Sequence, residues 1–129
     1  MQKRRIAFIG AGNMTAAIIS GLVKSGYKSN LITASNPSPE KLTKLADLHG
    51  INTTQDNHVA VAESDVIVLA VKPQLMEQVC QDLAQQSLKG KVFVSIAAGI
   101  NSDRLLAMLG GDYPLIRTMP NTPSLLGKG

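Results

Sequence analysis

The sequence has 129 residues, of which 44% are hydrophobic and 17% are charged, so the chain is long enough for one compact domain with a single core. Basic residues outnumber acidic ones by 13 to 9 but are scattered, and aromatic residues make up only 3%, which argues against a nucleic-acid-binding module. No apolar run reaches the roughly 20 residues of a membrane span, and the start lacks the apolar core of a secretory signal, so we expect a cytoplasmic protein without a membrane segment.

Short apolar segments with little alternation are typical of parallel strands that are buried on both faces. Such segments occupy residues 5–9, 31–34, 66–71, 92–96 and 115–117. Helical patterns separate them and begin near residues 14, 38, 73 and 101. A regular alternation of strands and helices predicts an α/β domain with a doubly wound, mainly parallel sheet and helices on both faces.

Two of the helical patterns predict details that the structure can test. In the first, an apolar face is expected from residues at helical spacing, namely Met14, Ala17, Ile18, Gly21 and Leu22. In the second, Ser38 is expected to cap the helix, Pro39 to occupy its first turn and Gly50 to close it.

Neither the cysteine nor the histidines suggest a metal site or a catalytic role. Cys80 is the only cysteine and is expected to be a buried structural thiol, on one helical face with Leu75, Val79 and Leu83. His49 precedes a helix-closing glycine, and His58 is expected in a polar loop. Neither has a partner that suggests metal or triad chemistry, so both are expected to be structural or solvated. We therefore expect no metal.

The turn between the first strand and the first helix carries the sequence "GAGNMT". Glycine at Gly10 permits a tight turn, and glycine at Gly12 removes the side chain that would block a pyrophosphate at the helix N-terminus. The alternative is that both glycines serve the turn geometry alone. Thr15 occupies the third position of the pattern, where glycine or alanine is usual.

The end of the second strand indicates which dinucleotide would fit. An acidic residue there would accept the ribose hydroxyls of NAD and would repel a 2′-phosphate, but residues 33–39 contain no carboxylate. Asn36, Ser38 and Lys41 are potential donors to such a phosphate. The sequence therefore favours NADP(H) over NAD(H), although plain turn chemistry also explains the Asn, Pro and Ser residues.

Four motifs follow one another along the chain, namely "FIGAGNM" at 8–14, "VIVLAVKPQ" at 66–74, "VSIAAGI" at 94–100 and "RTMPNTP" at 117–123. Together they resemble the N-terminal domain of pyrroline-5-carboxylate reductases, and the resemblance covers all 129 residues. The resemblance implies a Rossmann-type fold and the reduction of Δ1-pyrroline-5-carboxylate to L-proline with NADPH or NADH, the last step of proline biosynthesis.

The resemblance also implies which residues contact the cofactor, whereas no catalytic residue is assigned. With the two glycines of the turn, the set is Gly10, Ala11, Gly12, Asn13, Met14, Asn36, Ser38, Asn57, Ala70, Val71, Lys72, Pro73 and Ala98. Two of these have a competing interpretation. Lys72 either attracts a phosphate or substrate carboxylate or is a surface lysine at a helix start, and Ala98 either lies beside the nicotinamide or allows a close helix contact.

In the family, a second, helical domain follows, supplies most of the substrate pocket and forms the homo-oligomer. The resemblance thus implies that residues 1–129 are an NADP-binding domain that lacks this second domain. Such a chain is expected to bind the cofactor but to catalyse little or no substrate reduction. Its partner would be a small molecule, pyrroline-5-carboxylate or proline. The alternatives are a dinucleotide-binding or regulatory module without catalysis, or a related NADP-dependent oxidoreductase.

Overall fold

Within the residues that the computed structural model describes, 4–97 and 99–117, strands and helices alternate along the chain. The strands are β1 (Ile6–Ile9), β2 (Ile32–Ser35), β3 (Asn52–Thr54), β4 (Val66–Leu69), β5 (Val92–Ser95) and β6 (Leu115–Arg117). The helices are α1 (Asn13–Lys24), α2 (Pro39–His49), α3 (Asn57–Ala62), α4 (Pro73–Leu83) and α5 (Ser102–Leu109), with a short 3-10 helix, η1 (Ser29–Leu31), before β2.

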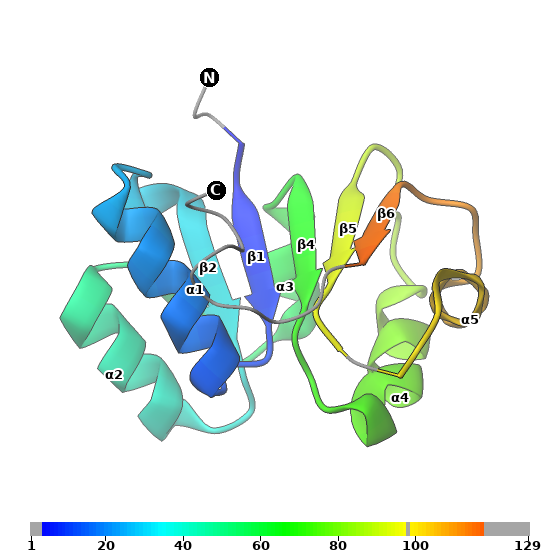
Figure 1. Ribbon diagram of the computed structural model, residues 1–129, viewed down its shortest axis with the longest axis horizontal. Helices are drawn as coiled ribbons and strands as arrows, with labels where there is room; N and C mark the ends of the chain where they lie inside the picture. Colours follow the sequence, from blue (N-terminus) through cyan, green and yellow to red (C-terminus); the bar gives the residue numbers. More distant parts are fainter. Residues whose placement is uncertain (1–3, 98, 118–129) are drawn as a thin grey trace.

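The strands form one parallel sheet in the order β3-β2-β1-β4-β5-β6 (Figure 1). The chain starts at the centre of the sheet in β1, moves outward to β3, returns to β4 on the other side of β1, and moves outward again to β6. β1 and β4 are therefore neighbours, although the chain leaves them toward opposite edges of the sheet. This is the doubly wound, Rossmann-type sheet that the sequence predicts.

Helices cover both faces of the sheet, and a separate apolar cluster lies on each face (Figure 1). α1 and α2 pack on one face, and α3, α4 and α5 pack on the other. Successive side chains of a strand point to opposite faces, so Phe8 joins the cluster under α1 while Ala7 and Ile9 join the other. Burial on both faces explains why the strands are continuously apolar.

The five strands predicted from apolar runs are present, with ends that differ by no more than a residue or two. β3 and α3 were not predicted from the sequence. β3 is a three-residue edge strand whose Asn52 and Thr53 are exposed, so it lacks the apolar signal. α3 has only six residues, too few for a clear helical period.

Two predicted helix faces are wrong in detail. In α1 the buried residues are Thr15, Ile18, Ile19 and Leu22, so the buried stripe is rotated away from the predicted one and Gly21 is exposed. In α4 the buried residues are Met76, Cys80 and Leu83, whereas Leu75 is 46% exposed. In both helices the apolar surface is wider than the core face, so spacing alone did not fix the orientation.

The predicted ends of α2 are confirmed except for the side-chain cap. Pro39 occupies the first turn and Gly50 closes the helix in a left-handed conformation, directly after His49. The Ser38 hydroxyl, however, donates to Glu40 Oε1 at 2.5 Å instead of capping the helix. This hydrogen bond lowers the pKa of the exposed Glu40 carboxyl.

Cys80 is fully buried in the cluster under α4, and burial raises the pKa of its thiol to about 11. The thiolate is therefore disfavoured at neutral pH, as a structural role requires.

Within the described residues, no helix is both long enough and apolar enough to cross a bilayer.

Gly10 makes a close contact between the ends of the two central strands. Its φ is +107°, and a Cβ on it would lie 2.8 Å from the Ala70 carbonyl oxygen and 3.0 Å from the carbonyl carbon. Its N–H donates to Ser35 O at 2.9 Å. Both the backbone conformation and the space available therefore require glycine at this position.

We expect Gly10→Ala to lower the free energy of unfolding by about 3 kcal/mol, because the variant combines left-handed strain with a clash against backbone atoms that have no room to move. Gly26→Ala is the matched control: Gly26 has a similar φ of +103°, but a Cβ on it would meet no described atom within 4 Å. Its expected loss is about 1 kcal/mol, from strain alone. Urea denaturation measures both, and equal losses would contradict the role of the Ala70 contact.

Candidate functional site

A pocket of about 430 Å³ lies at the carboxyl ends of β1, β2 and β4. In an open α/β sheet this edge, at the point where the strand order reverses, is where ligands bind. The described part of its wall consists of Ile9, Gly10, Ala11, Gly12, Ser35, Asn36, Pro37, Lys41, Asn57, Ala70, Val71, Lys72, Leu75, Gln78 and Val79.

The N-terminus of α1 faces this pocket, and no side chain of the described residues caps it. Gly12 is the N-cap residue, and the first turn of α1 contains no acidic residue. The first helical hydrogen bond to Gly12 O comes from the Ala16 N–H at 3.0 Å, so the N–H groups before it have no helical acceptor. Unpaired N–H groups at a helix N-terminus attract an anion.

Gly12 is not required by the fold in the way that Gly10 is. Its φ of −83° suits any residue, and a Cβ on it would meet no described atom within 4 Å. The missing side chain therefore leaves open space in the pocket wall at the start of α1. For Gly12 this favours the ligand interpretation over turn geometry, whereas turn geometry fully explains Gly10.

Thr15 stabilises the turn from inside the helix. Its side chain is 1% exposed, and its Oγ1 donates to Gly10 O at 2.7 Å. The hydroxyl thus satisfies a buried carbonyl of the turn, which a glycine or alanine at this position could not do. The departure from the usual third residue has a structural reason in this chain.

Asn36 connects the glycine turn to the end of β2. Its Oδ1 accepts from the Ala11 N–H at 3.1 Å, and its Nδ2 donates to Ser38 O at 3.2 Å. Asn36 therefore holds the turn in place and also lines the pocket.

The charged side chains that line the described wall are Lys41 and Lys72, and that part of the wall carries no carboxylate. Lys41 lies in the first turn of α2, and Lys72 is the N-cap residue of α4. The site thus has a positive balance, which suits an anionic ligand.

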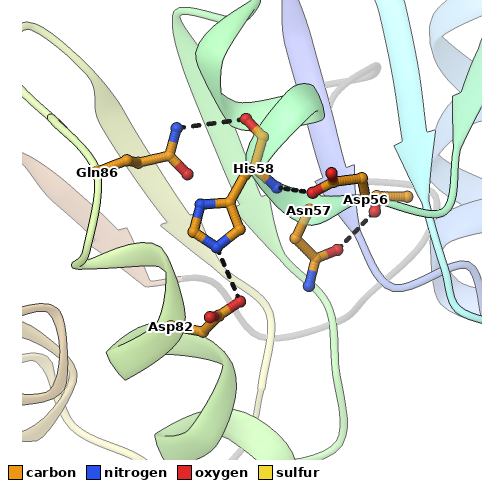
Figure 2. Close-up of polar contacts among 6 residues, drawn as sticks. Asp56, Asn57, His58, Asp82 and Gln86 are labelled. Carbon is orange, nitrogen blue, oxygen red and sulfur yellow. Dashed lines mark hydrogen bonds and ion pairs between the residues drawn. The ribbon is translucent and has the colours of Figure 1, made fainter.

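Asn57 is the first residue of α3 and lies against the end of β2. The fully buried Ser35 donates its hydroxyl to Asn57 Oδ1 at 2.5 Å. The prediction that His58 lies in a polar loop is wrong, because His58 lies in α3, where its Nε2 is 3.0 Å from Asp82 Oδ2 (Figure 2). The partner could not be found from sequence, since it lies 24 residues away on α4.

The structure brings most of the sequence-predicted site residues into the pocket wall, namely Gly10, Ala11, Gly12, Asn36, Asn57, Ala70, Val71 and Lys72. Asn13, Met14, Ser38 and Pro73 are outside the described wall, and Ala98 lies outside the described residues. Cofactor contact by any of these residues remains a prediction.

The sequence analysis did not include Ser35, Pro37, Gln78, Ile9, Leu75 or Val79 among the site residues. Leu75 and Val79 were predicted to share a helical face with Cys80; both line the pocket from α4, and Val79 also packs against the core cluster that contains Cys80. Their apolar character was a signal for burial, and only the orientation of α4 shows that they face the pocket.

Among the described residues no group of three or more His, Cys, Asp or Glu side chains could hold a metal ion.

A family model described as "NADP oxidoreductase coenzyme F420-dependent" matches residues 5–99. The chain belongs to this family. Among curated relatives, the pyrroline-5-carboxylate reductases of Vibrio alginolyticus and Pseudomonas aeruginosa are 52% and 49% identical to it over 129 residues. These alignments cover 100% of the chain and 47% of each relative, so the chain spans about half the length of the curated relatives it matches.

Solved structures of similar proteins agree with the fold. A pyrroline-5-carboxylate reductase from Coxiella burnetii superimposes with a TM-score of 0.88 at 39% identity, covering 94% of the chain and 45% of that structure. A pyrroline carboxylate reductase from Plasmodium falciparum with NADP bound gives a TM-score of 0.83 at 29% identity, with coverages of 99% and 46%. The resemblance to the N-terminal domain of these reductases is confirmed.

We expect Thr15→Val to lower the free energy of unfolding by about 1–2 kcal/mol, because it leaves the buried Gly10 carbonyl without its side-chain donor. Thr15→Ser keeps the hydroxyl and is expected to lose less. Urea denaturation of the two variants beside the parent chain measures the difference. A Thr15→Val variant as stable as the parent chain would contradict the role of this hydrogen bond.

Proposed function

We propose that this chain is the dinucleotide-binding part of a Δ1-pyrroline-5-carboxylate reductase, an oxidoreductase that reduces the C=N bond of its substrate to give L-proline. The observation that carries the proposal is the start of α1, where Gly12 leaves open space and the first N–H groups have no acceptor among the described residues. The curated relatives with this name support the substrate and reaction.

The pocket fits NADP(H) better than NAD(H). The α1 N-terminus suits the pyrophosphate, and the end of β2 lies where the adenosine ribose binds in folds of this type. There, Lys41 is available for a 2′-phosphate and residues 33–39 offer no carboxylate to the ribose of NAD. NADH is the alternative cofactor. The Plasmodium relative with NADP bound supports the same choice.

The opposite half of the pocket suits the nicotinamide. Ala70, Val71, Leu75 and Val79 make an apolar wall at the end of β4 and the start of α4. When bound, the cofactor supplies the hydride for the reduction. The chain's own residues orient it: the α1 amides hold the pyrophosphate, and the small side chain of Ala70 lets a flat ring approach. Lys72, on the rim, attracts a phosphate or the substrate carboxylate.

The proposal includes the remaining expectations for the complete enzyme. Residues 1–129 form the cofactor domain, and a helical domain of the reductase supplies most of the substrate pocket and forms a homo-oligomer. The half-exposed Leu75 at the pocket would then lie near the substrate side. We place the enzyme in the cytoplasm with a small-molecule substrate and without nucleic acid; a sequence with one cysteine, Cys80, agrees with a reducing compartment.

The first test is a titration of the chain with NADPH, followed by calorimetry or nicotinamide fluorescence. We expect a dissociation constant of about micromolar size, and we expect Gly12→Ala to weaken binding by about tenfold or more, because its Cβ occupies the space for the pyrophosphate. Folding should be unaffected, since that Cβ meets no described atom within 4 Å.

Gly21→Ala is the matched control, because Gly21 lies on the same helix in equally open space but outside the described pocket wall. It should bind NADPH like the parent chain. If Gly12→Ala also binds normally, the ligand interpretation of Gly12 is wrong; if the parent chain binds neither NADPH nor NADH, the proposed function fails. Proline formation assayed on the same sample is expected to be little or none.

We expect Lys41→Ala to reduce the preference for NADPH over NADH by about three- to tenfold, because it removes a charged partner of the 2′-phosphate. Lys44→Ala is the matched control, since Lys44 is exposed on the same helix but does not line the described pocket. Affinities of both nucleotides for both variants give the ratio. A parent chain that binds NADH as tightly as NADPH would refute the predicted preference.

A further inference from the structure

We propose that the ion pair between His58 and Asp82 is a positioning device for Asn57 in the dinucleotide pocket. The inference rests on the proposed function and goes beyond it, by assigning a role to two residues outside the described pocket wall. The pair joins α3 to α4, with His58 Nε2 3.0 Å from Asp82 Oδ2 (Figure 2). A carboxylate only accepts, so Nε2 carries the proton and donates.

His58 is held at three different atoms. Its N–H donates to Asp56 Oδ1 at 2.9 Å, which caps α3. Its carbonyl oxygen accepts from Gln86 Nε2 at 3.3 Å, and its ring donates to Asp82. In Figure 2, Gln86 and Asp82 contact His58 from the side opposite to Asp56 and Asn57. The main chain directly after Asn57 is therefore fixed from outside the helix.

α3 needs such external contacts because it has only six residues. A helix this short is not stable by itself, so its position depends on what it packs against. Its buried residues are Ala60 and Val61, which lie in its second half. The first half, which carries Asn57, is anchored by polar contacts instead.

Asn57 transmits this anchoring to the pocket. Its Oδ1 accepts from the buried hydroxyl of Ser35 at the end of β2, and its side chain lines the pocket between β2 and α3. Ser35 engages one lone pair of Oδ1, so Asn57 can offer a ligand its side-chain amide N–H groups and the second lone pair of Oδ1. Their direction depends on where α3 begins, which the contacts of His58 determine.

The effect of breaking the pair should be modest, because the side chains of His58 and Asp82 are 37% and 50% exposed. We expect His58→Ala and Asp82→Ala each to weaken NADPH binding by about two- to fivefold, the range that a partly exposed ion pair supports. His58→Gln should bind nearly like the parent chain, because its side-chain amide can still donate to Asp82. Calorimetry measures all of these affinities.

A role in general stability would produce a different pattern. Asn57→Ala should weaken binding by itself, by about tenfold. If His58 acts through Asn57, adding His58→Ala to Asn57→Ala should have no further effect on the NADPH dissociation constant. Thermal unfolding of each variant establishes that it is folded. His49→Ala is the control, because His49 is the last residue of α2 and lies outside the described pocket wall.

Three results would overturn the inference. His58→Ala could bind like the parent chain, His58→Gln could fail to restore affinity, or His58→Ala could weaken binding as much in the Asn57→Ala variant as in the parent chain. A parent chain that binds NADPH normally while any of these occurs leaves the proposed function standing. Absence of NADPH binding by the parent chain would instead remove the proposed function, and this inference with it.

Discussion

The close approach of Gly10 to the Ala70 carbonyl is the constraint on which the site depends. With 2.8 Å between a Cβ at Gly10 and that oxygen, no other residue fits between the ends of β1 and β4. Two hydrogen bonds join the strand ends here: the Gly10 N–H donates to Ser35 O at the end of β2, and the Ala70 N–H donates to Ile9 O at the end of β1. The ends of β1, β2 and β4 are therefore fixed relative to one another, and the pocket lies directly on them.

The helix N-termini at this edge of the sheet divide into two groups. α3 and α5 are capped by the side chains of Asp56 and Asn101, so their first N–H groups have acceptors. α1, α2 and α4 have no side-chain cap among the described residues, and residues at or near the start of each line the pocket. The uncapped start of α1 thus leaves main-chain donors open where an anion would bind, whereas α3 begins at the same pocket with its start capped by Asp56.

The parts of the fold that sequence predicts are those whose local pattern and tertiary environment agree. β1 and β4 are buried on both faces and read as continuous apolar runs, and Gly10 marks the turn because only glycine fits. β3 and α3 carry no such signal, since the first is a polar edge and the second is too short. Contacts such as Ser35 with Asn57 or His58 with Asp82 join residues 22 and 24 apart, so only the folded chain reveals them.

The two halves of the pocket differ in a way that follows from how each is built. On the β2 side, Asn36 and Asn57 are held by hydrogen bonds to the main chain and to Ser35, which gives a polar surface with fixed directions. On the β4 side, Val71 and Val79 present apolar atoms without such fixed directions. Under the proposed function, the first half selects the nucleotide by directional hydrogen bonds and charge, while the second only accommodates a flat ring. Substitutions on the β2 side should therefore alter which cofactor binds, and those on the β4 side how the reacting ring is placed.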